Sequence, residues 1–188
     1  MAIVEVIIVP IGSFPISEAA LVTDVLGERF PEGVRFRLLP SRLHVPLTLF
    51  DWSRAQYRAG EVALHLAGSL GILDPPRILA LGLSEADAFV EGLNFVFGVA
   101  LPTAGAAVVF SRRLYARDRN LYLERLIKES MHEVGHLLGL DHCPNPRCVM
   151  SFSNSIHDVD RKEAAFCEAC LTKLEDYISR LGRSLGSR

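Results

Sequence analysis

The histidine spacing in residues 131–143, MHEVGHLLGLDHC, constrains the fold of this chain more than any other feature. Residues four apart on an α-helix lie on one face, so His132 and His136 can reach the same metal ion. A straight helix would carry His142 past that ion. Gly139 removes this obstacle, because glycine tolerates the left-handed conformation in which helices commonly end. The spacing therefore predicts a helix that ends near Gly139 and a chain that turns back with His142.

The acidic residue inside this motif is expected to have a different task. Glu133 follows His132 by one position, so it points to the side of the ligand face, within reach of a water on the ion. Three histidines leave a fourth tetrahedral position open for that water, as in a catalytic zinc site. We therefore predict that Glu133 is a general base. The predicted ligands of this zinc are His132, His136 and His142.

The complete string H-E-x-x-H-x-x-G-x-x-H occupies residues 132–142 and is the signature of the metzincin clan of zinc proteases. Members of that clan also have a tight turn that carries a methionine beneath the metal. Met150 follows His142 by eight residues, in the segment CVMSF, and we interpret it as this Met-turn methionine. The alternative is an ordinary methionine of the hydrophobic core.

All four cysteines lie in the last quarter of the chain as two close pairs, Cys143 with Cys148 and Cys167 with Cys170. Two such pairs can surround one ion in a closed tetrahedral site, which stabilises the fold and leaves no open position. Cys143 directly follows His142, and adjacent residues of an extended segment point to opposite sides, so each can serve a different ion. We therefore predict a structural zinc on the four cysteines. A redox-active C-x-x-C pair and two disulfides are the alternatives.

Hydrophobic periodicity predicts an α/β or α+β fold with a mixed sheet of about five strands. The expected strands are residues 3–9, 34–40, 77–83, 94–99 and 106–111, and the expected helices are residues 17–30, 52–70, 120–140 and 160–181. Ser17, Asn120 and Asp160 are the expected helix caps. The segment after residue 141 is rich in Pro, Asn and Ser, so it is expected to be irregular and to need something that holds it.

Composition argues against several classes of protein. Of the 188 residues, 49% are hydrophobic and 22% are charged, which is enough for a buried core. The net charge of −2 provides no excess of positive charge that would attract nucleic acid or an acidic membrane surface. A solvated face is the expected role of the basic cluster Arg112, Arg113, Arg117, Arg119, Arg125 and Lys128.

Two apolar stretches are expected to be strands. The uncharged residues 92–111 are interrupted by Asn94, Pro102 and glycines, so they predict two strands and a loop instead of a membrane span. The N-terminal stretch lacks a basic residue before its apolar run and is expected to be a buried strand, not a signal peptide. A cytoplasmic location is therefore expected.

Two segments, HEVGHLLGLDHCPNPRCVM and FCEAC, together resemble the archaemetzincins, a small family of the metzincin clan. The resemblance implies a compact metzincin-like fold. Such a fold has a twisted sheet with backing and active-site helices, followed by a small C-terminal subdomain with the Met-turn and a terminal helix. We expect a single catalytic domain, residues 1–188, with an upper subdomain at 1–139 and a lower subdomain at 140–188.

The same resemblance implies a function. It implies two zinc ions per chain, one catalytic and one structural, and hydrolysis of peptide bonds in peptide or protein substrates, with aminopeptidase-like cleavage in some members. By analogy with related proteases, a strand within residues 94–111 is expected to accept an extended substrate. We expect a monomer without nucleic-acid or membrane partners. The alternatives are a zinc-stabilised peptide-binding module with a vestigial catalytic site, and a hydrolase of non-peptide substrates.

Overall fold

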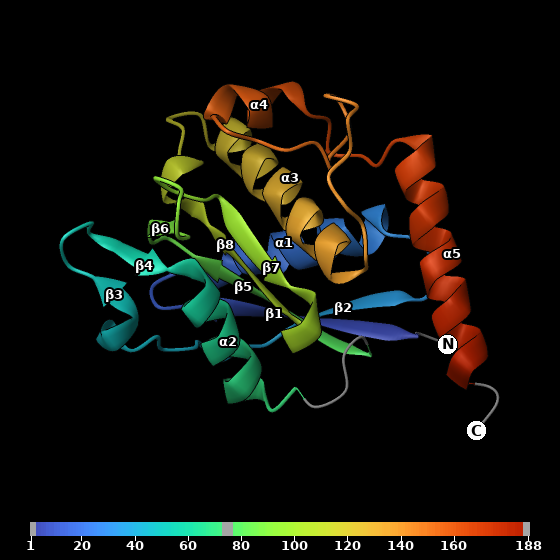
Figure 1. The fold of residues 1–188 in the computed structure, drawn as a ribbon, viewed down its shortest axis with the longest axis horizontal. Coiled ribbons are helices and arrows are strands. Elements are labelled where there is room, and N and C mark those ends of the chain that lie inside the picture. The colour runs from blue at the N-terminus through green and yellow to red at the C-terminus, as the bar shows by residue number, and fades with distance from the viewer. Residues whose placement is uncertain (1–2, 73–76, 186–188) are drawn as a thin grey trace.

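The structure, a computed structural model, describes residues 3–72 and 77–185 and is built around a five-stranded mixed sheet (Figure 1). The strand order is β2-β1-β5-β8-β7. The strand bounds are β1 Val4–Ile11, β2 Val34–Leu38, β5 Ile78–Ser84, β7 Gly98–Leu101 and β8 Ala106–Phe110. Neighbouring strands are parallel except at the edge, where β7 runs antiparallel to β8. The predicted mixed sheet of five strands is therefore confirmed.

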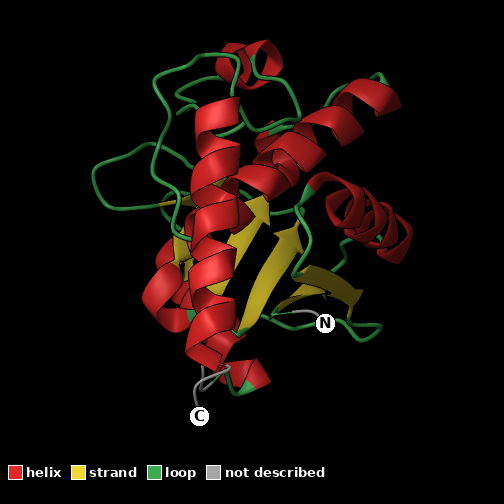
Figure 2. Ribbon diagram, turned by 90° about the vertical axis from the view of Figure 1, so that its right-hand side faces the viewer, coloured by secondary structure: helices red, strands yellow, loops and turns green. Residues whose placement is uncertain are grey.

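Helices cover both faces of this sheet (Figure 2). Their bounds are α1 Ile16–Arg29, α2 Ala59–Leu70, α3 Arg119–Leu137, α4 Ile156–Arg161 and α5 Glu168–Leu185. Alternate residues of β1 serve the two faces, as the pleat of a strand requires. Val6 and Ile8 join the core shared with α1, α3 and α5, whereas Ile7 and Val9 join the core shared with α2. Burial on both faces explains why β1, β5 and β8 are nearly continuous hydrophobic runs.

The helix predicted at residues 52–70 begins later than expected, at Ala59. The residues before it form a hairpin that belongs to a small second sheet, in the order β3-β4-β6. The bounds of these strands are β3 Phe50–Asp51, β4 Gln56–Arg58 and β6 Ala88–Phe89. Asp51 directs the chain into the hairpin, because its carboxylate accepts hydrogen bonds from the backbone N–H groups of Ser53 and Arg54.

Two helices begin at residues other than the predicted caps. α1 follows Pro15, so Ser17 lies inside the helix and does not cap it. α3 is capped by Asp118, whose carboxylate accepts a hydrogen bond from the backbone N–H of Asn120, the residue predicted as the cap. Asp118 is a favoured cap residue two positions before Asn120, whereas Pro15 stands at the cap position of α1 without a side-chain hydrogen bond.

The last predicted helix, residues 160–181, is in fact two helices, α4 and α5. Ser155 caps α4 through a capping box, so Asp160 is not a cap and lies within α4. Its carboxylate accepts hydrogen bonds from Arg125 of α3 at 2.6 and 2.7 Å. This arginine lowers the pKa of Asp160.

The predicted solvated basic face is wrong at two of its residues. Arg125 is 9% exposed and Lys128 is 2% exposed. Both lie on the side of α3 that packs against α4, and Lys128 forms an ion pair with Glu124 at 2.6 Å. Burial is tolerated because each cation has an acidic partner.

The first strand of the predicted hairpin in residues 94–111 is displaced toward the C-terminus. β7 begins at Gly98 instead of residue 94, and the connection to β8 is a 3-10 turn that ends at Gly105, with a φ of 69°. Because β7 is an edge strand, its outer side is not paired with another strand of the described chain. Within the described residues, no helix combines the length and hydrophobicity that crossing a membrane needs.

Candidate metal centres

The end of α3 brings three histidines together. This helix carries His132 and His136 one turn apart. The chain then turns at Gly139, whose φ of 81° lies in the left-handed region, and returns with His142. One ring nitrogen of each histidine lies within 4.8 Å of a ring nitrogen of the other two. The donor atoms are therefore close enough to surround a single ion.

Two backbone carbonyls determine which nitrogens face each other. Nδ1 of His132 donates to the carbonyl oxygen of Val149 at 2.8 Å, and Nδ1 of His136 donates to that of Leu140 at 2.7 Å. The Nε2 atoms then carry lone pairs, and they lie 3.0 Å apart. Lone pairs at this separation repel each other unless a proton or a cation lies between them. Two imidazole ligands of a tetrahedral zinc would be about 3.3 Å apart, so the pair fits that ion.

The surroundings favour the neutral form of all three imidazoles, which is the form that binds a metal. Burial lowers the pKa of His132 well below its ordinary value, and the positive charge of Lys162 acts in the same direction. Burial is also the main cause that lowers the pKa of His136 and of His142.

Glu133 lies between this cluster and the edge strand β7. It is 5% exposed, and a Cβ at position 98 would lie 2.6 Å from its Cδ, so Gly98 leaves the room that the carboxylate occupies. Burial, reinforced by the negative charge of Glu129, raises the pKa of Glu133 well above its ordinary value. A carboxylate with a raised pKa is a better proton acceptor than a solvated one.

Met150 packs against the helix beneath the histidines and is fully buried. A Cβ at Gly135 would come within 3.0 Å of Met150 Cε and would overlap the sulfur. The carbonyl oxygen of Met150 also accepts a hydrogen bond from the backbone N–H of Cys143 at 2.9 Å. Met150 is thus held against α3 on one side and against the segment that follows His142 on the other.

A cavity of about 560 Å³ lies between β7 and α3. Its lining includes Gly98, Val99 and Ala100 from the strand and His132, Glu133 and His136 from the helix. Phe152 stands at its margin, 47% exposed, with its ring centroid 4.9 Å from that of His142. A ligand that lies along β7 would therefore pass directly over the histidines.

The four cysteines form a second cluster, in which the sulfur atoms lie within 4.8 Å of one another. None of the four is joined in a disulfide. The sulfurs of Cys143 and Cys167 are 3.7 Å apart. Two thiolates on a tetrahedral zinc would be about 3.8 Å apart, so this separation fits the ion. Four sulfurs around one point favour a metal over a two-thiol redox pair.

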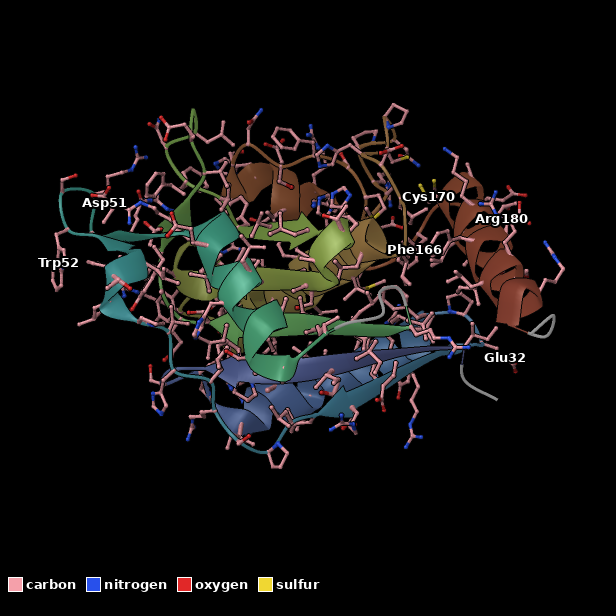
Figure 3. The ribbon with its side chains drawn as sticks, turned by 60° about the horizontal axis from the view of Figure 1, so that its bottom comes forward. Glu32, Asp51, Trp52, Phe166, Cys170 and Arg180 are labelled. Carbon is pink, nitrogen blue, oxygen red and sulfur yellow. The ribbon has the colours of Figure 1, made fainter. Side chains whose placement is uncertain are left out.

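The cysteine cluster joins the irregular segment to the last helix. Cys170 lies in the first turn of α5, close to Phe166 and at the opposite end of the molecule from Trp52 of the β3–β4 hairpin (Figure 3). The backbone N–H of Cys167 donates to the sulfur of Cys148 at 3.4 Å. The backbone N–H of Cys170 lowers the pKa of Cys167 to about 7, which favours a thiolate ligand.

Sequence reasoning missed three residues near the histidines. No role was predicted for Gly98. Glu129 and Lys162 form a buried ion pair at 2.8 Å, and the two residues are far apart in the sequence. The helical period gives a signal for Glu129, because it lies one turn before Glu133 on the same face of α3.

Comparison with known proteins identifies the class to which this fold and these donors belong. A family model described as peptidase family M54 matches residues 39–176. The crystal structure of the archaemetzincin from Methanopyrus kandleri has a TM-score of 0.80 and 36% identity, covering 94% of this chain and 96% of that chain. The structure of a zinc-dependent peptidase from Methanocorpusculum labreanum has a TM-score of 0.80 and 28% identity, covering 90% of this chain and 99% of that chain. The protein is a zinc metalloprotease of the metzincin type.

A curated relative narrows this class to one family. The archaemetzincin of Pyrococcus furiosus is 39% identical over 187 residues, which are 95% of this chain and 94% of that protein. This chain belongs to the archaemetzincin family, and the predicted family and metzincin-like fold are confirmed.

Proposed function

We propose that this chain hydrolyses peptide bonds at its histidine cluster, where His132, His136 and His142 hold a zinc ion. One observation carries the proposal. The Nε2 atoms of two helical histidines face each other in a cavity that a buried carboxylate and an unpaired strand edge also border. Zinc bound there would act as a Lewis acid and would make water a usable nucleophile near neutral pH.

The chain's own residues have distinct tasks in this reaction. The Glu133 carboxylate is the general base, which takes a proton from the attacking water and later gives it to the leaving amine. The carbonyls of Val149 and Leu140 orient the two helical imidazoles. Gly98 leaves the room that the Glu133 carboxylate occupies, because a side chain there would displace it.

The edge strand β7 is the proposed docking site for the substrate backbone. Its inner side pairs with β8, and its residues line the cavity, so an extended peptide can add as a further strand. Main-chain pairing does not depend on one particular side chain. It therefore suits peptide or protein substrates as a class.

An aminopeptidase-like reaction is the finer proposal. Such an enzyme needs an anion for the ammonium group at the substrate N-terminus. Asp141 is exposed and lines the cavity directly beside His142. Glu129 also lines it, but its charge is already balanced by Lys162. Asp141 is therefore the proposed anchor.

A second, structural zinc is proposed on the four cysteines. It would tie the irregular segment and Met150 to α5 and so stabilise a lower subdomain, residues 140–188, beneath an upper subdomain, residues 1–139. Thiols held for a metal suit the cytoplasm, where disulfides are rare, and we propose that location for a monomeric enzyme.

Cleavage of a mixed-sequence peptide library, followed by mass spectrometry, tests the proposal. The zinc-loaded wild type is compared with Glu133→Gln, which keeps the shape of the side chain and removes its basicity. Cuts by the wild type alone are expected, and their positions distinguish trimming of ends from internal cleavage. If neither protein cuts any peptide although both hold zinc at the histidines, the peptidase reaction is wrong and a peptide-binding module becomes the better description.

A further inference from the structure

The buried ion pair between Glu129 and Lys162 lies directly under the histidine cluster. The two side chains are 3% and 1% exposed, and Lys162 Nζ lies 2.8 Å from Glu129 Oε1. Glu129 belongs to α3, one turn before Glu133, and Lys162 follows immediately after α4. The pair therefore connects the helix that carries two histidines to the segment beyond Met150.

Lys162 has a second contact that leads to a histidine. Its Nζ donates to the carbonyl oxygen of Val149 at 3.4 Å, and the same oxygen accepts the hydrogen bond from Nδ1 of His132 at 2.8 Å. The ammonium group thus lies between the Glu129 carboxylate and the carbonyl that orients the imidazole. One side chain couples a charge on α3 to the position of the His132 ring.

Stability alone is a poor explanation for this pair. Removing two charges from water is costly, and hydrophobic side chains of similar volume often stabilise a fold as well as a buried ion pair does. The junction of α3 and α4 also has another ion pair, between Arg125 and Asp160, which makes two hydrogen bonds. Arg125 donates to the carbonyls of Leu114 and Tyr115, whereas Lys162 donates to the same carbonyl that accepts the hydrogen bond from His132.

We infer that Glu129 and Lys162 are a positioning pair, in which Lys162 fixes the Val149 carbonyl that orients His132 and Glu129 fixes Lys162. The inference rests on the proposed function, because it gives His132 the role of a metal ligand. Groups that orient a ligand from behind commonly change metal affinity by about 10- to 100-fold when they are removed.

The first experiment measures zinc affinity and stability together. Glu129→Gln/Lys162→Met replaces both charges with neutral side chains of similar size, and Arg125→Met/Asp160→Asn is the matched control at the neighbouring pair. Zinc alone is titrated against a chromophoric chelator while the cysteine site stays filled, and unfolding is followed separately. We expect about a 10- to 100-fold weaker histidine site in the first variant and wild-type zinc affinity in the control, even where the control unfolds more easily.

A charge exchange keeps the test decisive if the neutral variant does not fold. Glu129→Lys/Lys162→Glu retains an ion pair between α3 and the end of α4, but it turns a carboxylate toward the Val149 carbonyl. A positioning role predicts that this variant folds and still binds zinc weakly at the histidines. A purely structural pair predicts that folding and zinc affinity both return.

The outcomes separate this inference from the proposed function. If the wild type holds only a zinc that depends on the cysteines, the proposed active site is wrong and the positioning role is wrong with it. If the wild type holds a histidine-dependent zinc and the neutral or exchanged variant binds it equally tightly, only the positioning role is overturned. A selective loss of affinity in both variants supports it.

Discussion

Gly98 lies directly against Glu133, so that the backbone of β7 and the carboxylate of α3 leave no room for a methyl group between them. The contact joins the edge strand of the sheet to the helix that carries the histidines. Since β7 is also the proposed docking strand, the same short segment positions both the substrate backbone and the general base.

Gly98→Ala should therefore impair catalysis without removing zinc. The new Cβ would push the Glu133 carboxylate out of its position, and a shift of this size at a reacting group can lower kcat about 100-fold. Peptide hydrolysis and zinc content are the measurements. Gly68→Ala in α2 is the control, because a Cβ there meets open space, and its activity should be unchanged. Full activity of Gly98→Ala would show that the contact is unimportant.

Glu133→Gln should stabilise the zinc-free protein at neutral pH although it abolishes catalysis. Burial raises the pKa of Glu133 in the folded state, so its stabilising contribution is complete below the ordinary glutamate pKa and is lost as the pH rises through the raised value. Glutamine has no such proton to lose. Urea unfolding in the presence of a chelator should show the advantage of the variant growing from about pH 4 to neutral pH. A constant difference across that range would contradict the burial of an ionisable group.

Gly135→Ala should destabilise the fold by about 1–3 kcal/mol, the usual cost of overpacking a filled core. The added methyl group would overlap the sulfur of Met150, which is fully buried and has little room to move. Gly27→Ala in α1 is the matched helical control, because its Cβ has no neighbour within 4 Å. In a Met150→Ala background, Gly135→Ala should cost less than in the wild type if Met150 is the residue in the way, although Met150→Ala is itself destabilising.

Cys167→Ser should mainly reduce stability, whereas His142→Ala should mainly reduce activity. The first should lower the midpoint of thermal unfolding sharply and release one zinc, because a closed metal site contributes folding free energy. The second should release the other zinc and abolish hydrolysis with a smaller effect on unfolding. Metal content and calorimetry measure both effects. Unchanged zinc content after replacement of all four cysteines would exclude the structural site.

Asp141→Asn should weaken hydrolysis of peptides that carry a free N-terminus and leave acetylated peptides unaffected. The reason is the loss of the anion proposed to pair with the substrate ammonium group. The ratio of kcat/KM for each peptide and its acetylated form is the measurement. An equal loss for both forms would assign Asp141 to positioning His142 instead of binding the N-terminus.

The histidine and cysteine clusters could be anticipated because their geometry follows from short-range rules. Two histidines one helical turn apart and a glycine at the helix end determine where three side chains meet, whatever the rest of the chain does. The central strands were predictable for a related reason, since burial on both faces leaves long hydrophobic runs.

The errors about polar residues arise where a side chain makes a contact that is distant in the sequence. Aspartate is a residue type that often caps helices, but Asp160 instead pairs with Arg125 of another helix. Lys128 belongs to a cluster that looks solvated, and charged residues are usually exposed, yet it is buried against α4. Lys162 stands in a segment without a motif. The packing of α4 on α3 brings these side chains into contact with the segment around Asp160, and hydrophobic periodicity carries no information about that packing.

His142 and Cys143 are neighbours in the chain, although their side chains belong to different donor clusters. A single peptide bond therefore separates a residue of the histidine cluster from a residue of the cysteine cluster. We expect oxidation of the thiols to disturb the backbone that presents His142, although the imidazole donors themselves resist oxidation. If the cysteines hold the proposed zinc, oxidising conditions should therefore lower peptide hydrolysis as well as stability.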